Sequence, residues 1–325
     1  MNARANGRGT FICPYANWMP DAFELKPMPK QIAYPVDLHL HSTASDGLKS
    51  PSELCQMADK LKLEHIALSD HDTLDGQAEM QAAAQAVREA RKARGDATPF
   101  RLLSCIELSS GHGGRVHILG YAPAPDDPAL ERCLLEAAED RRQRAAKMLM
   151  LLDKQGLEIP EEQKRLLLSP HVGRAHIARA LVKAGKVKSM QEAFDRFLAE
   201  GGSAYVPRKL LEPAEALSIL KGAGAVTVFA HPRRLGLDEP QLYALLEELI
   251  AFGLDGVEAY HPSASRGDAR VLDDYARRRG LLVTGGSDYH GDLNARTRMG
   301  RMPAGWASLR EDIERLEEKI EARKR

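Results

Sequence analysis

Seven short apolar runs, most of them separated by helical patterns, restrict the fold of this chain more than any other feature. The runs are rich in Val, Ile and Leu, as strands buried on both faces of a sheet are. They are VDLHL (36–40), HIALSD (65–70), LLSCIEL (102–108), RVHILGY (115–121), AVTVFA (225–230), GVEAY (256–260) and LLVTGGS (281–287). Because helices lie between most of these strands, we predict an α/β protein with a parallel, barrel-like sheet rather than a sandwich.

One long stretch of the sequence lacks apolar runs of this kind. Between 122 and 210 only helical patterns occur, and they lie at Leu130–Asp153, Val172–Ala184 and Met190–Ala199. We therefore predict a helical insert, or cap domain, at 122–210 within a barrel domain formed by 35–121 and 211–325. Residues 1–34 contain four prolines and no hydrophobic periodicity, so we expect an irregular N-terminal extension there.

The composition excludes several classes of protein. Lys and Arg together number 46, as do Asp and Glu, and aromatic residues make up 5%, which weighs against binding duplex DNA or long single strands. The four cysteines, Cys13, Cys55, Cys105 and Cys133, form no CxxC pair, so neither a disulfide-rich fold nor a cysteine zinc site is expected. The sequence shows no stretch near the roughly 20 apolar residues that span a bilayer. We expect a cytoplasmic protein with no membrane partner, and the sequence indicates no obligate protein partner.

Histidine and carboxylate side chains recur where the predicted strands end. His39 and His41 are two residues apart on the first strand, so they share one face of it. Asp46 follows in a turn that can fold back over the strand end. The other candidates are close to the later predicted strands, either within a strand or just after it. They are His71, Glu107, His117, His231, Asp288 and His290. The C-terminal ends of the strands are where (β/α) barrels build their active sites.

This ligand set indicates metal binding. Imidazole and carboxylate groups suit Zn, Mn or Fe, and no thiolate is offered. Any single histidine is more often a core or surface residue, but chance does not place six histidines at five strand ends. Nine ligands exceed the needs of one or two ions, whereas three ions that share a bridging carboxylate would use them all. The sequence has no GxSxG motif and no catalytic cysteine setting to suggest a covalent route.

The motifs that carry these residues resemble those of a known family. DLHLHS with a following SDG, then LSDHDT, IELS, VHILGY, AHP and GSDYH resemble the motif series of the PHP (polymerase and histidinol phosphatase) family. Within it, GRAHIARALVKAG (173–185) and AFDRFLAEGGSAYVPR (193–208) resemble a narrower branch. That branch contains the 3′,5′-nucleotide bisphosphate phosphatases and the 5′-to-3′ exoribonuclease RNase AM. The resemblance implies a distorted (β/α)7 barrel of the PHP type with an inserted helical cap domain.

The resemblance also implies how the ligands divide among three divalent ions. One ion would be held by His39, His41, Glu107 and Asp288, and a second by Asp46, His71 and His290. A third would share Glu107 and add His117 and His231. Manganese is the expected metal, with iron and zinc as alternatives, and a metal-activated hydroxide would attack the phosphorus.

Recognition of a second phosphate needs fixed cations away from the metals. Our candidates are Arg174, His176, Arg208 and Lys209, because arginine in particular matches phosphate oxygens with two parallel hydrogen bonds. The alternative for each is an ordinary surface charge on the helical insert. His261, at the end of the sixth strand, is a further catalytic candidate that would protonate the leaving 3′ oxygen or contact phosphate, with a structural role as its alternative.

The predicted reaction is hydrolysis of the 3′-phosphate ester of a 5′-phosphorylated nucleotide. A 3′,5′-nucleoside bisphosphate would give a nucleoside 5′-monophosphate and phosphate, and a short 5′-phosphorylated RNA would be trimmed from its 5′ end. Two alternatives are another small phosphomonoesterase, acting on histidinol phosphate or a nucleoside monophosphate, and a non-catalytic nucleic-acid accessory module. The zero net charge weighs against the second alternative. The physiological substrate, the metal and the oligomeric state stay open.

Overall fold

A computed structural model describes residues 35–111, 115–169, 172–291, 297–302 and 309–324. The N-terminal extension predicted at 1–34 lies outside the described residues. All seven predicted strands are present, and their bounds are β1 (Val36–Leu40), β2 (His65–Leu68), β3 (Arg101–Ser110), β4 (Val116–Tyr121), β5 (Val226–Phe229), β6 (Gly256–Tyr260) and β7 (Leu282–Gly285).

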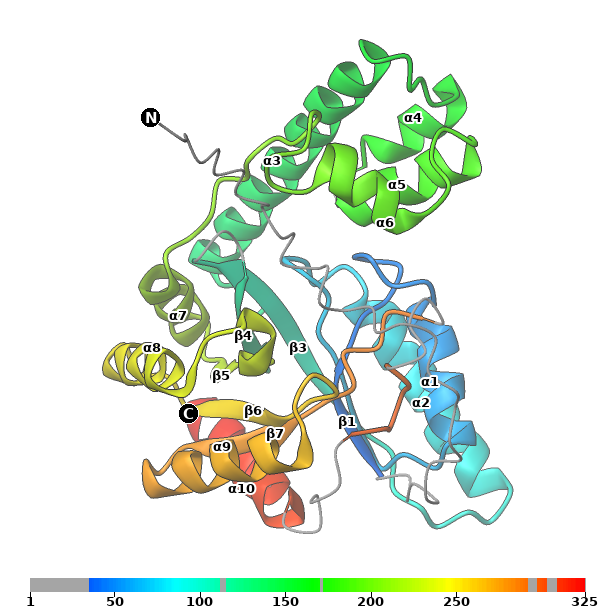
Figure 1. The fold of residues 1–325 in the computed structure, drawn as a ribbon. Coiled ribbons are helices and arrows are strands. Elements are labelled where there is room, and N and C mark those ends of the chain that lie inside the picture. The colour runs from blue at the N-terminus through cyan, green and yellow to red at the C-terminus, as the bar shows by residue number, and fades with distance from the viewer. Residues whose placement is uncertain (1–34, 112–114, 170–171, 292–296, 303–308, 325) are drawn as a thin grey trace, which may run out of the picture.

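The strands form one sheet in the order β1 to β7, and its two edges meet (Figure 1). The chain beyond β7 closes the barrel against β1, because His41 N donates to Tyr289 O and Asp288 N donates to His39 O, each at 3.0 Å. Gly286 permits this approach, since a Cβ atom there would lie 2.1 Å from the Cβ of His39. The predicted barrel-like α/β fold is thereby confirmed.

The direction of β4 corrects one part of the prediction, because the sheet is not wholly parallel. β4 pairs antiparallel with β3 and with β5. The reason lies in the connection: only residues 111–115 separate β3 from β4, and a parallel partner needs a crossover of about a dozen residues or more. As a result, the N-terminal part of β4 lies at the edge where the other strands end, and His117 stands opposite Ser109 of β3.

Six helices of the described residues pack around the outside of the barrel. They are α1 (Pro51–Lys60), α2 (Gln77–Ala93), α7 (Pro213–Gly222), α8 (Glu239–Ala251), α9 (Arg266–Arg278) and α10 (Leu309–Arg323). The start of α1 shows how the sequence sets their bounds, because Ser50 and Glu53 form a reciprocal capping box and Pro51 occupies the first turn. Among the helices, α10 buries Ile313, Leu316 and Ile320 in the main core.

A group of helices between β4 and β5 has a second hydrophobic core. The group, here called the helical segment, comprises α3 (Pro128–Asp153), α4 (Glu161–Leu167), α5 (Arg174–Lys183), α6 (Met190–Ala193) and the π-helix η2 (Phe194–Leu198). α3 belongs to both cores, because Leu130 packs in the barrel core and Leu152 packs in the core of the segment. Figure 1 shows α3 leading from the barrel to α4, α5 and α6 at its far end. Helices therefore occur where the sequence indicates them, and a separate domain at 122–210 stays a prediction.

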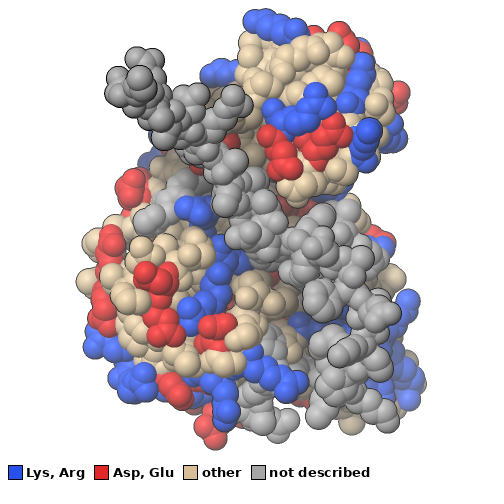
Figure 2. All heavy atoms as spheres, in the orientation of Figure 1, with Lys and Arg blue, Asp and Glu red and all other residues tan. Residues whose placement is uncertain are grey.

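The charges on the molecular surface are mixed. Acidic and basic side chains are interspersed over the face shown in Figure 2, in keeping with 46 of each in the sequence. In the described ranges, the structure contains no helix with the length and apolar character that crossing a membrane requires.

Candidate metal centre

The strand ends bring one fully buried group of four predicted ligands together. His39 Nε2 lies 3.0 Å from His41 Nε2 and 3.3 Å from Glu107 Oε2. His41 Nε2 lies 3.2 Å from Glu107 Oε2 and 3.2 Å from Asp288 Oδ1. His39 lies in β1, His41 directly follows β1, Glu107 lies in β3, and Asp288 follows β7. These four residues are the set that the family resemblance implies for one ion.

A second group lies beside the first and is more accessible. It comprises His41, Asp46, His71 and His290, each with a ligand atom within 4.8 Å of the others. His290 Nε2 lies 3.1 Å from Asp46 Oδ1, and the ring of His290 stacks on that of His41 with centroids 4.1 Å apart. The geometry thus adds His41 to the three ligands that the resemblance implies for a second ion.

A third group gathers around Glu107. His71 Nδ1 lies 3.0 Å from Glu107 Oε2, and His117 Nδ1 lies 2.8 Å from Glu107 Oε1. His231 Nε2 also lies 2.8 Å from Glu107 Oε1. His71 therefore joins the implied set of Glu107, His117 and His231, so all nine predicted ligands meet in one cluster. Their division among ions stays a prediction.

The donor set fits divalent cations. Within the described part of the chain, several buried atoms of the cluster have no hydrogen-bond partner, and they are His41 Nδ1, His71 Nδ1, His231 Nδ1, Glu107 Oε2 and Asp288 Oδ1. Two histidine nitrogens 3.0 Å apart, both facing carboxylate oxygens, also form an arrangement that a cation between them would satisfy. Neutral imidazole and ionised carboxylate are the ligands that Mn, Fe and Zn accept.

The electrostatics keep the carboxylates ionised. Burial alone would raise the pKa of Glu107, but His71 and His117 hold it well below its ordinary value. Burial opposes ionisation of Asp288 in the same way, yet Arg234 and His290 keep its pKa well below the ordinary value. Both acids are therefore charged at neutral pH, as metal ligands must be.

The buried histidines His39, in β1, and His41, directly after it, respond to these charges. Burial alone would lower the pKa of His41, but the neighbouring carboxylates of Asp288 and Glu107, each 3.2 Å from its Nε2, raise it to about 10. Burial likewise opposes protonation of His39, and the charges of Glu258 and Glu107 raise its pKa well above the ordinary value. The cluster thus attracts positive charge strongly, either as protons on histidine or as cations.

Glu258 holds a ligand in place and was not anticipated from the sequence. Its Oε1 lies 3.0 Å from His39 Nδ1, and its Oε2 accepts from His231 N at 2.8 Å. A carboxylate on the outer nitrogen of a ligating histidine fixes the ring orientation and the tautomer. The only signal was an acidic residue inside the apolar run GVEAY, where burial makes an unpaired charge costly.

His261 lies at the edge of the cluster. It is 2% exposed, its Nε2 lies 3.4 Å from Asp288 Oδ2, and its Nδ1 lies 2.7 Å from Ser263 Oγ. Its ring centroid is 5.3 Å from that of His231. The structure thus brings His261 to the ligands, while its role as a proton donor stays a prediction.

The four predicted phosphate-binding residues occupy different positions. Arg208 reaches the barrel, because its Nη2 lies 3.0 Å from Asp72 Oδ2. The ring of His176 accepts from Gly173 N at the start of α5. The guanidinium of Arg174 lies 5.8 Å from the ring centroid of Tyr205. Lys209 is 83% exposed, 3.8 Å from Glu136, so it lies in solvent.

Two further arginines of the helical segment reach the barrel and were not anticipated. Arg141 of α3 donates to His71 O at 3.1 Å and contacts Asp72. Arg179 of α5 donates to Asp46 O at 3.0 Å. Both are spaced along helices like ordinary surface arginines, so the linear sequence gives no signal that their heads turn toward the ligands. With Arg208, they place three guanidinium groups beside the cluster.

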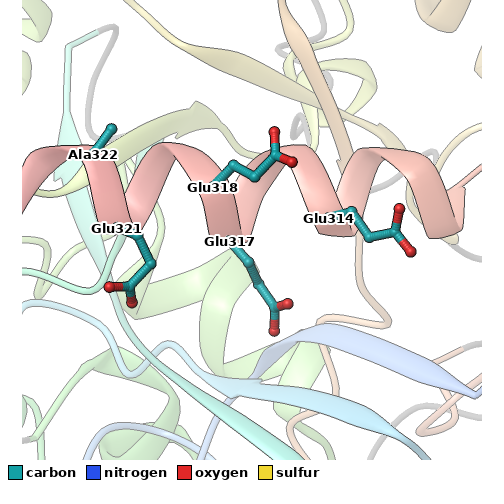
Figure 3. Close-up of a pocket in the computed structure, with 5 residues that line it drawn as sticks. All are labelled: Glu314, Glu317, Glu318, Glu321 and Ala322. Carbon is teal, nitrogen blue, oxygen red and sulfur yellow. The ribbon is translucent and has the colours of Figure 1, made fainter.

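A surface pocket on α10 lies outside this cluster. Figure 3 shows its lining, which consists of Glu314, Glu317, Glu318, Glu321 and Ala322. Glu317 pairs with Arg101 at 3.3 Å. The pocket contains no histidine and no predicted ligand, so the candidate site is the strand-end cluster.

Known proteins with similar sequences also place the strand-end residues in a recognised family. A model of the PHP domain matches residues 37–111. Over 285 residues the chain is 30% identical to a 5′-3′ exoribonuclease of Haemophilus influenzae, and the match covers 87% of this chain and 96% of that relative. The chain belongs to the PHP family. The residues that match the PHP model include the first five predicted ligands, which are His39, His41, Asp46, His71 and Glu107.

Two further comparisons cover most of the chain of this PHP-family member. It is 34% identical to a 3′,5′-nucleoside bisphosphate phosphatase of Chromobacterium violaceum, over 78% of this chain and 87% of that relative. The crystal structure of a protein of Bifidobacterium adolescentis, classed as a metal-dependent phosphoesterase, superposes with a TM-score of 0.72 at 30% identity. That match covers 88% of this chain and 97% of the other. The similarity thus extends beyond residues 37–111 to most of the chain.

Proposed function

We propose that this chain is a metal-dependent phosphoesterase that hydrolyses the 3′-phosphate ester of 5′-phosphorylated nucleotides. Its substrates would be 3′,5′-nucleoside bisphosphates, which give a nucleoside 5′-monophosphate, and short 5′-phosphorylated RNA, which is shortened from the 5′ end. Both reactions break the same ester bond and differ in the group attached to the 3′ phosphate. Similarity to a bisphosphate phosphatase and to a 5′-3′ exoribonuclease supports this choice.

The observation that carries the proposal is the position of the arginines relative to the ligands. The carboxylate of Glu107 lies within 3.3 Å of five histidines of the cluster, and Arg141 donates to the backbone of one of them, His71. A phosphate on the metal ligands and a second phosphate on guanidinium groups can therefore belong to one small molecule. Guanidinium suits the second position because it binds phosphate oxygens in a bidentate manner.

The residues of the chain divide the chemical work. Divalent ions in the cluster would neutralise charge on the phosphate and activate a water. His39 lies in β1 and His41 directly follows it, and Glu258 fixes the ring of His39. We propose that His261, whose Nε2 lies 3.4 Å from Asp288 Oδ2, donates a proton to the leaving 3′ oxygen.

The test is release of phosphate from adenosine 3′,5′-bisphosphate and of nucleotides from a short 5′-phosphorylated RNA. Both assays are run with manganese and with a chelator, in the native chain, in His39→Ala and in the matched control His65→Ala. His65 lies outside the cluster, 3.7 Å from Glu317. We expect activity in the native chain and in His65→Ala, and none with chelator or in His39→Ala.

The outcomes separate the alternatives. Activity on the bisphosphate alone means that the site accepts a terminal 3′ phosphate but not a 3′ phosphate that carries an RNA chain. Equal activity on adenosine 3′-monophosphate, which lacks the 5′ phosphate, contradicts a second phosphate site and leaves a general monoesterase. No turnover of any substrate by folded, metal-loaded protein rejects the enzyme assignment.

A further inference from the structure

Asp72 is a buried carboxylate that joins the barrel to two parts of the helical segment. It follows His71 with a φ of 51°, and its Oδ1 accepts from Ser109 N of β3 at 2.8 Å. Its Oδ2 contacts Arg141 of the outgoing helix α3 and lies 3.0 Å from Nη2 of Arg208 on the returning chain. One side chain of the barrel therefore holds guanidinium groups from both connections to the helical segment.

The two arginines keep donors that Asp72 does not use. A guanidinium carries five N–H donors. Arg208 uses Nη2 for Asp72, and its buried Nε has no hydrogen-bond partner among the residues that the structure describes. Arg141 uses Nη2 for Asp72 and Nη1 for His71 O. Each group is thus held on one side and has donors left for a phosphate.

The charges of Asp72, Arg141 and Arg208 together favour an anion, although Asp72 is itself a carboxylate. Two guanidinium groups and one carboxylate leave one net positive charge within hydrogen-bond distance of Asp72. Arginine side chains lose rotamer freedom when they bind a ligand, and a carboxylate that already fixes them reduces that loss. A phosphate at this position would therefore meet two guanidinium groups that Asp72 already holds.

We infer that Asp72 is a positioning residue for substrate recognition, which fixes Arg141 and Arg208 so that they bind the 5′ phosphate while the 3′ phosphate lies on the metal ligands. The inference rests on the proposed function, because it assumes a substrate with two phosphates. It also gives Arg141 and Arg208 a defined geometry relative to His71, the neighbour of Asp72 in the chain. Asp72 acts through the arginines and does not itself touch the substrate.

The variant Asp72→Asn tests this role with little steric change. Asparagine tolerates a positive φ and keeps an oxygen for Ser109 N, but it removes the charge that holds the arginines. We expect KM for adenosine 3′,5′-bisphosphate to rise about tenfold or more, the loss typical of a charge-assisted hydrogen bond, with kcat little changed. Turnover of adenosine 3′-monophosphate, which lacks the 5′ phosphate, should keep the native kcat/KM.

Two further variants make the experiment decisive. Asp153→Asn is the matched control, because Asp153 pairs with Lys164 at 2.6 Å within the helical segment, and we expect native KM values for it. Arg208→Gln should reproduce the selective rise in KM, and the double variant with Asp72→Asn should lose less than the product of the two single effects. Calorimetric titration with adenosine 5′-monophosphate should show weaker binding in Asp72→Asn and native binding in Asp153→Asn.

Each contrary result has a clear meaning. An equal fall of kcat/KM on both substrates, in Asp72→Asn or in Arg208→Gln, indicates a structural role and overturns the inference. A fall in KM for the bisphosphate indicates that Asp72 only repels the phosphate, which also overturns it. If the native chain itself does not cleave the bisphosphate, the proposed function fails. If the native chain cleaves it and the Asp72→Asn variant has the same KM, only the inference about Asp72 fails.

Discussion

Glu258 of β6 contacts His39 of β1 and thereby orients the ring of this ligand. It is 1% exposed and contacts His39 Nδ1 at 3.0 Å. We predict that Glu258→Gln lowers the affinity for manganese about 10- to 100-fold, because the ligating ring loses the carboxylate that fixes it. Competition with a metallochromic chelator measures the affinity directly.

The control for this prediction is Glu247→Gln. Glu247 is an exposed residue of α8 that contacts Tyr275 and Arg279, so the same chemical change there should leave manganese affinity unaltered. Native affinity in Glu258→Gln would show that the backbone alone sets the position of His39.

At the level of single residues, the sequence predicted the candidate ligands that lie at the ends of strands. His39, His41 and Asp288 belong to short motifs that end or follow strands, and the topology of a barrel brings such ends together. Glu258 and Arg141 were missed for a different reason. Their partners are distant in the chain, 219 residues in the case of Glu258 and His39, and only the folded register brings them together.

Among the elements, α10 is attached to the barrel in part through one buried acid. Asp255 Oδ1 pairs with Lys319 at 2.9 Å and with Arg323 at 2.8 Å, and its Oδ2 accepts from Thr227. Burial alone would raise the pKa of Asp255, but the Thr227 hydrogen bond and the two cations lower it. The folded pKa is thus below the unfolded one, so the ionised form stabilises the fold.

We predict that Asp255→Asn lowers the free energy of unfolding at pH 7 by about 2 kcal/mol, as expected for hydrogen bonds to a charged group. The contribution is present above the unfolded pKa of Asp255, near 3.8, and is lost as the pH falls through the lower folded value. Urea unfolding across this range measures the difference, which should shrink toward low pH. Asp274→Asn, at an exposed position of α9, is the control, and a difference independent of pH would refute the ion-pair explanation.

For the secondary-structure elements, the sequence predicted the positions of the strands but not the antiparallel direction of β4. All seven strands were recognised from their apolar runs, yet a parallel sheet was expected throughout. Direction depends on the length of each connection and not on the composition of the strand. The short link at 111–115 contained that information, since it leaves no room for a crossover helix.

For the molecule as a whole, the ligand cluster should couple stability to metal binding. Only the folded barrel assembles residues from β1, β3 and the chain after β7, so an ion binds the native state preferentially. We predict that manganese at 100 times its dissociation constant raises the free energy of unfolding by about 2.7 kcal/mol per site. Differential scanning calorimetry with and without manganese measures the shift in Tm.

His39→Ala should abolish most of this shift, whereas His65→Ala should retain it. Magnesium at the same concentration should stabilise less, because it prefers oxygen ligands over imidazole. A Tm that does not respond to manganese would show that the nine residues do not hold an ion.

The position of the helical segment also has a consequence for the order of folding. β4 and β5 are neighbours in the sheet, with Ile118 opposite Phe229, although residues 122–225 separate them along the chain. The entropy cost of closing such a loop grows only slowly with its length, but pairing across it slows folding. Helix contacts within the segment are local and form early. We therefore expect the barrel to complete its β4–β5 seam last, after the inserted helices have packed and drawn the two strands together.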